Sequence, residues 1–400
     1  MTLILNNEEV RQAVTMADCV EAIEEAFIEV GRGWAMSDPR TDRYMPASRE
    51  QIAAELGIPL SDLERTIIHE RMAKDAHVES GALDAPLAYM FKTMFGAIHK
   101  TGIAALRTSS EILSRPVVNG KARLAKIPAG PGGRYTSLIQ LFSTRTGQLL
   151  CIMPDGQIQR DRVVATGAVG TRVLARKNVR TMGLLGSGMM AGGSIEATLV
   201  ARPDLELVKV YSPNRAHRHD FARLWSSRCE IEVRPVESAE EAVADVDIVV
   251  GATNSREPVI RGEWLRPGMH LNITSNSEID EACYSRADLS VITWRAAGDA
   301  TWRIQNYALP AAPEAEDAGQ AISTNDKQLL QKYGARMPEL SDLLTERAAG
   351  RADDEQITLH INLSAGVQFA ALGGPIFKNA RAKGLGREVP TDWFLEEMHP

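Results

Sequence analysis

The chain has 400 residues, with 45 Lys and Arg against 52 Asp and Glu, so its formal net charge is −7. This length predicts two or three domains, and the acidic balance argues against a general nucleic-acid binder or a basic membrane-surface protein. The four cysteines form no CxxC pair, which favours reduced thiols over a disulfide framework or a zinc site.

The N-terminus lacks the basic and apolar regions of a secretory signal. No stretch of about 18 uncharged apolar residues occurs, so the sequence predicts no membrane span. A cytoplasmic protein is therefore expected, with neither nucleic acid nor a membrane as its partner.

The first predicted elements are helical. Apolar residues recur at helical spacing over 8–32 and predict one or two helices, with Asp18 as a cap of the second half and Gly31 or Gly33 as its end. Helix formers also dominate 48–74. The surrounding segment, from about 45 to 85, is open to two interpretations, a lid over the substrate or a peripheral helix at a dimer edge.

Short apolar runs follow between glycine and proline breaks. Such runs are typical of the strands of a mixed sheet. Residues 144–148 predict the turn of a hairpin. The best strand candidates are 103–107, 135–142 and 148–154.

From about residue 160, helical and strand patterns alternate, which indicates an α/β fold with a Rossmann-type, doubly wound parallel sheet. The chain then becomes polar and closes with a predicted helix over 361–384. One Rossmann module is therefore inserted between flanks of a different architecture. Helices are expected at 163–176, 217–227 and 238–245, and strands at 206–212, 229–236, 246–253 and 269–274.

A GxGxxA motif is formed by Gly186, Gly188 and Ala191, after an apolar run and before a helical pattern. The first glycine permits a tight turn, and the second lets the backbone approach a pyrophosphate that binds at the helix N-terminus. The motif therefore predicts a bound dinucleotide. Its phosphate-binding residues are predicted to be Gly186, Ser187, Gly188, Met189 and Met190.

The end of the next strand distinguishes the two nicotinamide dinucleotides. A site that prefers NAD usually places a carboxylate there, whereas this chain has Ser212, Asn214 and Arg215. Ser212 and Arg215 are suited to a 2′-phosphate, so NADP is favoured over NAD, although Arg215 can also be read as a solvated surface residue. Ala252, Thr253 and Asn254, after the fourth strand, are expected on the nicotinamide side.

Other chemistries have little support. The histidines show no metal-ligand spacing, and no serine lies in a GxSxG motif, so neither a metal site nor a hydrolase is predicted.

Several segments, in this order, resemble the ornithine cyclodeaminase/mu-crystallin family. The resemblance implies a homodimer in which 1–162 together with 325–400 form an α+β substrate-binding and dimerisation domain, and 163–324 form the NAD(P)-binding domain. It also implies an NAD(P)-dependent oxidoreductase acting on the C–N bond of a small imine or amino acid that bears a carboxylate. The matching segments are DPRT at 38–41, TRTGQLLCIMPDG at 144–156, the helix entered through 159–162, GLLGSGMMA at 183–191, SREPVIRGEWLRPGMH at 255–270 and ITLHINLSAGVQFAAL at 357–372.

The resemblance also implies site residues. Arg40 and Arg162 match the arginines that bind the substrate carboxylate. The family's strand lysine, which binds the carboxyl group and moves a proton, matches Arg107 here. Because arginine is a poor proton donor at neutral pH, the donor is left open between Lys92, Lys100 and an ordered water.

A second departure lies at the end of the 269–274 strand. Asn276 and Ser277, in a shortened loop, replace the catalytic aspartate of the cyclodeaminases, and Glu278 and Asp280 are interpreted as structural. Asparagine can orient a ligand but cannot take up a proton, so a reductase or dehydrogenase is favoured. The alternatives are an ammonia-releasing cyclodeaminase and an NADPH-binding, crystallin-like protein without turnover.

Overall fold

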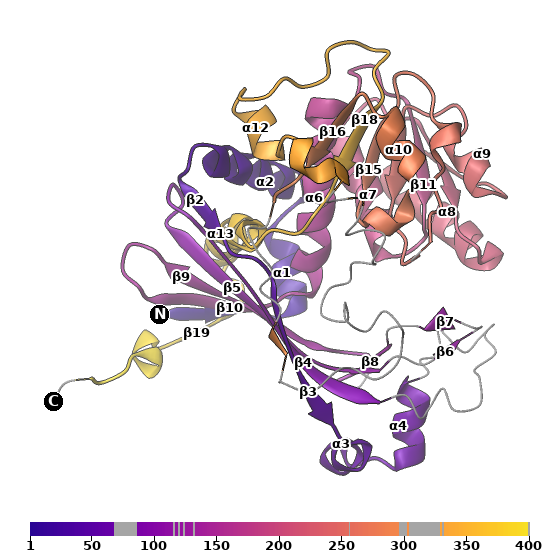
Figure 1. Ribbon diagram of the computed structural model, residues 1–400. Helices are drawn as coiled ribbons and strands as arrows, with labels where there is room; N and C mark the ends of the chain where they lie inside the picture. The colour runs from indigo at the N-terminus through magenta and orange to yellow at the C-terminus, as the bar shows by residue number, and fades with distance from the viewer. Residues whose placement is uncertain are drawn as a thin grey trace.

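The computed structural model describes residues 1–67, 86–114, 117–118, 121–122, 125–130, 133–255, 257–295, 302–303, 329 and 332–398. Two large sheets dominate these residues, one entirely parallel and one mixed. Figure 1 shows the parallel sheet at the upper right and the mixed sheet running from the left to the lower right. Of the described helices, none is long and apolar enough to cross a membrane.

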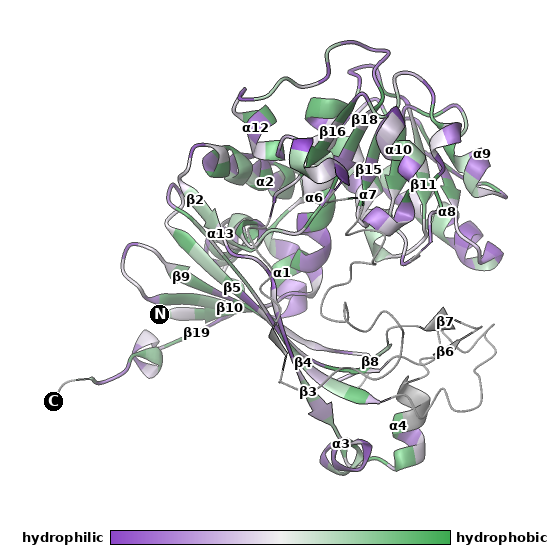
Figure 2. Cartoon of the chain, in the orientation of Figure 1, coloured by the Kyte–Doolittle hydropathy of each residue, from purple (hydrophilic) through white to green (hydrophobic). Residues whose placement is uncertain are grey.

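The parallel sheet has seven strands in the order β13-β12-β11-β14-β15-β18-β16. Its strands are apolar on both faces, and the outer surfaces of the covering helices are hydrophilic (Figure 2), as expected for a doubly wound sheet. The predicted α/β fold is therefore confirmed. In sequence order the strands are β11 (Thr181–Leu185), β12 (Leu207–Tyr211), β13 (Glu232–Pro235), β14 (Ile248–Gly251), β15 (His270–Ile273), β16 (Leu289–Ile292) and β18 (Thr358–Ile361).

The helices of this part follow the predicted alternation. Those that pack beside the sheet are α7 (Met189–Ala201), α8 (Arg215–Cys229), α9 (Ala239–Val243) and α10 (Glu281–Arg286), with the 3-10 helix η3 (Asn276–Glu278) between β15 and α10.

One part of the expected helix 361–384 is different in the structure. The helix α13 begins only at Val367 and ends at Ala382, and Thr358–Ile361 form β18, which pairs with β15 and β16. A short, fully buried apolar run cannot be assigned to strand or helix by its periodicity. Because β18 belongs to the parallel sheet, residues 358–361 lie with the 163–324 segment. The domain boundary at 324 stays a prediction. It assigns 358–361 to the other domain, whereas β18 lies in the parallel sheet.

The mixed sheet joins the two ends of the chain. Its order is β17-β3-β4-β5-β9-β10-β1-β19, with β2 paired to β4 and β8 paired to β5. The predicted hairpin at 144–148 is confirmed, since β9 and β10 pair antiparallel across it. The strands are β1 (Thr2–Ile4), β2 (Ala35–Ser37), β3 (Thr41–Ala47), β4 (Leu87–Ile98), β5 (Ile103–Ser114), β8 (Ala125–Ile127), β9 (Thr136–Ser143), β10 (Leu149–Pro154), β17 (Trp302–Arg303) and β19 (Arg387–Val389).

The predicted helical region 8–32 forms two helices, α1 (Asn7–Ala13) and α2 (Met16–Gly31). Thr15, rather than Asp18, is the N-cap of α2. Asp18 occupies the third helical position, and its Oδ2 accepts a hydrogen bond from Thr15 N at 2.8 Å, which completes a capping box.

The segment after β3 forms α3 (Arg49–Leu56) and α4 (Leu60–Ile67), which pack on one end of the mixed sheet around Leu63, Leu87 and Ile127. This contact is peripheral. Residues 68–85 lie outside the described residues, so the choice between a lid and a peripheral helix is not tested for them.

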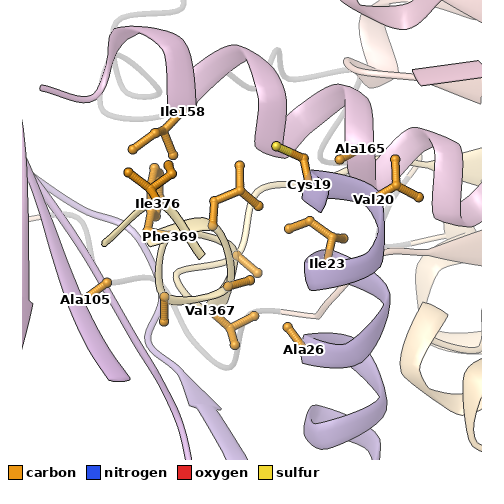
Figure 3. Close-up of a cluster of buried hydrophobic side chains, with 14 of the residues drawn as sticks. Cys19, Val20, Ile23, Ala26, Ala105, Ile158, Ala165, Val367, Phe369 and Ile376 are labelled. Atoms are coloured by element: carbon orange, nitrogen blue, oxygen red, sulfur yellow. The ribbon is translucent and has the colours of Figure 1, made fainter. Parts of the chain in front are cut away.

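One hydrophobic core joins the two sheets. In Figure 3, α13 is seen end-on between the mixed sheet and α2, with α6 (Gly156–Leu174) crossing above. Phe27, Phe369 and Ile23 are among its fully buried side chains. Because α6 starts directly after β10 and then packs against α7, β15 and β18, its first turns lie where the two sheets meet.

Candidate active site

The GxGxxA turn lies at the carboxyl edge of the parallel sheet, between β11 and α7. Gly186 has φ +114°, and a Cβ atom there would lie 2.4 Å from the carbonyl oxygen of Ala252, so only glycine fits. Gly188 is the N-cap of α7 and supplies no side-chain hydrogen bond, which leaves the first N–H groups of the helix for a ligand. Met190 packs against the core, whereas Met189 is exposed. These features fit a dinucleotide pyrophosphate.

Ser212 and its neighbours follow β12 (Leu207–Tyr211) and precede α8 at the same edge of the sheet. Ser212 is buried and accepts a hydrogen bond from Ser187 Oγ at 2.9 Å. Asn214 caps α8 by accepting from His217 N, and Arg215 is the first residue of that helix, with an exposed side chain. The distance from Arg215 Nε to Glu237 Oε1 is 3.9 Å, which is too long for a hydrogen bond.

The carboxylate of Glu237 is engaged by another residue. Arg218, which is buried, donates to Glu237 Oε2 at 2.7 Å and to the carbonyl oxygen of Ser212 at 2.9 Å. Arg218 therefore supports the loop, and the guanidinium of Arg215 lies at the surface, 3.9 Å from Glu237 Oε1.

Glu278 ties together the loops that follow β14 and β15. Its Oε1 accepts from Thr253 N at 2.6 Å and Thr253 Oγ1 at 2.9 Å, and its Oε2 accepts from Ser275 N at 3.1 Å. Burial raises the pKa of Glu278 despite these bonds. Asp280 caps α10 and accepts from Gly262 N. Both carboxylates thus support loops, in agreement with the sequence interpretation.

Asn276 opens η3 at the same edge of the sheet. Its side chain is buried, and no described residue donates to its Oδ1. A buried amide oxygen without a donor is costly, so this position fits contact with a ligand. Asn254 is exposed beyond β14.

Four cations lie close together where the mixed sheet meets the parallel sheet. We call them the cation cluster: Arg40, Lys92, Arg107 and Arg162. Lys92 pairs with Asp42 on one neighbouring strand and with Ser109 on the other, and Ser109 pairs with Ser137. Directly opposed residues share a face, so these strands carry a polar row on the face that α13 covers.

Two members of the cation cluster have carboxylate partners. Arg40 holds Asp42 in a bidentate ion pair, in which Nε lies 2.8 Å from Oδ1. Burial opposes its charge, but the hydrogen bonds and charge of Asp42 raise the pKa of Arg40. Arg107 is buried and donates to Asp155 Oδ2 at 2.8 Å. Asp155 in turn is the N-cap residue of α6.

Arg162, by contrast, donates only to neutral acceptors among the described residues. It donates to Gln159 Oε1 at 2.9 Å, to Gln368 Oε1 at 2.7 Å and to Ser364 Oγ at 2.9 Å, and it stacks on the Phe369 ring. Burial, together with the charges of Arg107 and Arg40, lowers the pKa of Arg162 to about 9. The charge of Asp155 opposes this lowering, and the guanidinium is still charged at neutral pH. Among the described residues, however, no carboxylate forms an ion pair with it.

Lys92 is the least satisfied member. It makes no hydrogen bond or ion pair with any part of the chain that the structure describes. Burial and the positive charges of Arg40 and Arg107 lower the pKa of Lys92 to about 7, although Asp42 and Glu111 oppose this. An amine that titrates near neutrality is suited to donating and accepting a proton.

The cation cluster faces the carboxyl edge of the parallel sheet. Ser364, which accepts from Arg162, follows β18 by three residues, so Arg162 links α6 to the strand end nearest the mixed sheet. The structure therefore brings the four predicted arginine and lysine residues together at the junction. It excludes Lys100, which is exposed and paired with Glu25 on α2.

Sequence reasoning missed several polar residues of the junction. Asp42, Asp155, Gln159 and Gln368 hold the arginines, and Glu111 accepts from Lys126 beside them. A signal was present in 107–111, where arginine, serine and glutamate alternate in a strand otherwise buried on that face. Such alternation indicates a polar site within a sheet face.

Comparisons with known proteins identify the family of this chain. The model of the "Ornithine cyclodeaminase/mu-crystallin family" matches residues 128–383. The Δ1-pyrroline-2-carboxylate reductase of Bacillus cereus is 26% identical over 257 residues, which cover 63% of this chain and 73% of that protein.

Solved structures share the fold. The Thermococcus litoralis Δ1-pyrroline-2-carboxylate reductase in complex with NADH and L-proline has a TM-score of 0.68 at 21% identity, covering 97% of this chain and 100% of that one. An archaeal alanine dehydrogenase dimer with bound NAD has a TM-score of 0.67 at 22% identity, covering 97% and 99%. At these identities the likeness shows the fold.

Proposed function

The chain belongs to the ornithine cyclodeaminase/mu-crystallin family and is an NAD(P)-dependent oxidoreductase, and we propose that it interconverts a small 2-imino acid and the corresponding amino acid. The observation that carries this proposal is that Arg162, which is buried, and Lys92, which is half-buried, form no ion pair with a carboxylate among the described residues. Buried charges are costly unless they are compensated, so the junction is suited to an anionic ligand. A substrate carboxylate supplies that charge.

Each residue of the cation cluster has a proposed role in the reaction. Bound NAD(P)H supplies a hydride to the imine carbon. Arg162 orients the substrate carboxylate through its planar fork, and Arg40 and Arg107 add positive potential while held by Asp42 and Asp155. Lys92 gives its proton to the nitrogen during reduction and takes it back during oxidation.

This proposal predicts carboxylate-dependent oxidation of NADPH or NADH, followed by absorbance. The panel contains cyclic imino acids and 2-oxo acids with ammonia or methylamine. Each imine is also offered as its carboxamide, which should be reduced at least about tenfold more slowly because it lacks the charge. Ammonia release from ornithine with NAD, without net cofactor consumption, would instead identify a cyclodeaminase.

The 2′-phosphate of NADP is the proposed ligand of Ser212 and Arg215. Replacing Arg215 by Glu is expected to raise the KM for NADPH at least about tenfold and to leave the KM for NADH within about twofold, because only NADPH carries the phosphate that a carboxylate repels. The matched control is Arg223→Glu, an exposed change two turns further along α8. Equal effects on both cofactors would assign Arg215 to the surface alone.

The outer face of the mixed sheet is the proposed contact between two copies of this chain. Apart from α3 and α4 at one end, no described α-helix packs on this face, which alternates with the face under α13. A related archaeal alanine dehydrogenase is a dimer. The half-exposed apolar side chains on this face of the present chain are Phe91, Phe95, Leu106, Leu138, Phe142 and Ile152.

Replacing Leu106 by Glu is expected to convert a dimer into a monomer, because it places a charge at the centre of that face. Analytical ultracentrifugation measures the change. Leu224→Glu, on the exposed surface of α8, is the control that should leave the mass unchanged. A dimer that persists in the Leu106 variant would place the contact elsewhere.

A further inference from the structure

Glu111 lies buried beside the cation cluster, and the described residues donate hydrogen bonds to only one of its two carboxylate oxygens. Oε1 accepts from Ser109 Oγ at 2.7 Å and from Lys126 Nζ at 2.6 Å. Oε2 is also buried, and no described residue donates to it. A buried acceptor without a donor is costly, so the free oxygen is suited to a donor that arrives with a ligand.

The position of Glu111 places this oxygen along the substrate rather than at its carboxylate. Arg107, Ser109 and Glu111 alternate along β5 and share the face that carries Lys92, which is directly opposite Ser109. Two residues of strand span roughly 6.7 Å, so Glu111 lies one such step beyond Lys92, on the side away from Arg107. This distance suits the far end of an amino-acid side chain.

We propose that Glu111 is a specificity-determining residue whose Oε2 accepts a hydrogen bond from a hydroxyl group on the substrate side chain. This rests on the proposed function and narrows its substrate class to hydroxyl-bearing 2-imino and 2-amino acids. A neutral donor fits better than an ammonium group, because Lys126 already compensates the charge of Glu111. Lys92 and Arg40 would repel a further cation.

The ligands that test this are L-homoserine and L-norvaline, which match in size and differ in a terminal hydroxyl or methyl group. Both are titrated by calorimetry into the protein saturated with NADPH. Because NADPH is already reduced and cannot accept a hydride from the amino acid, no turnover occurs during the titration. Homoserine is expected to bind at least about tenfold more tightly, since an unpaired carboxylate oxygen disfavours the methyl group. Equal binding of the two ligands would overturn the inference about Glu111 and leave the proposed function intact.

Two variants separate recognition from support. Glu111→Met is expected to abolish the preference for homoserine, and Glu111→Gln, which keeps an acceptor for Ser109 and Lys126, to reduce it. Glu25→Gln, in an exposed glutamate–lysine pair, is the control that should retain it. If the Glu111 variants weaken both ligands equally, the residue acts only on the cation cluster. If neither ligand binds wild-type protein, the proposed function fails and the inference with it.

Discussion

Replacing Lys92 by Met is expected to lower kcat/KM for imine reduction at least about a hundredfold, because the side chain with the best placed proton is lost. Methionine retains the length and burial of the aliphatic stem, so the change tests the amine rather than the packing. Lys92→Arg is the matched variant. It keeps the positive charge for the substrate carboxylate but holds its proton at neutral pH, so kcat should fall more than KM rises.

The pH dependence of kcat/KM tests the proposed role of Lys92 independently. Burial and neighbouring positive charges lower the pKa of Lys92 to about 7, so the protonated form dominates below that pH and the free amine above it. As the acid in reduction, Lys92 predicts kcat/KM that falls as the pH rises through about 7. As the base in oxidation, it predicts a rise over the same range. Both limbs should disappear in the methionine variant. A reduction rate that stays flat from pH 6 to pH 8.5 in the wild-type protein would contradict the assignment.

The parallel sheet could be predicted from the sequence because its signals are local. Each strand is a short apolar run, each connection is a helix, and the glycines at 186 and 188 mark the phosphate turn. The expected helix 361–384 included the last residue of β18, because this buried strand lies shortly before α13 and both are apolar. The pairing of β18 between β15 and β16 depends on partners 88 and 69 residues earlier in the chain.

The cation cluster was predictable only in part, because its geometry depends on the register of the mixed sheet. The sequence identified Arg40, Arg107 and Arg162 through the family resemblance, and left the proton donor open. The register favours Lys92 over Lys100, since it puts Lys92 in the polar row opposite Ser109, whereas Lys100 lies in the turn beyond β4. Nor can sequence distance reveal that Arg40 and Arg107 are already paired with carboxylates while Arg162 is not.

This difference between the arginines leads to the second large expected effect. Replacing Arg162 by Gln should raise the KM for a carboxylate substrate about 30-fold or more, since losing one partner of a buried charge pair costs about 2–5 kcal/mol and each 1.4 kcal/mol is tenfold. Arg40→Gln should have a smaller effect, because Asp42 already compensates Arg40. Arg172→Gln, later on the same helix and paired with Glu24, is the control for α6 itself.

The carboxamide analogue of the substrate decides what the Arg162 variant has lost. If Arg162 binds the carboxylate, its replacement by Gln should hardly change the KM for the carboxamide, and the affinity for NADPH should stay within about twofold. If Arg162 only anchors α6 against Ser364 and Gln368, both substrates and the thermal stability should suffer together. A rise confined to the carboxylate therefore requires that the charge without a partner in α6 is held for the substrate, because the other contacts of Arg162 are the same for either ligand.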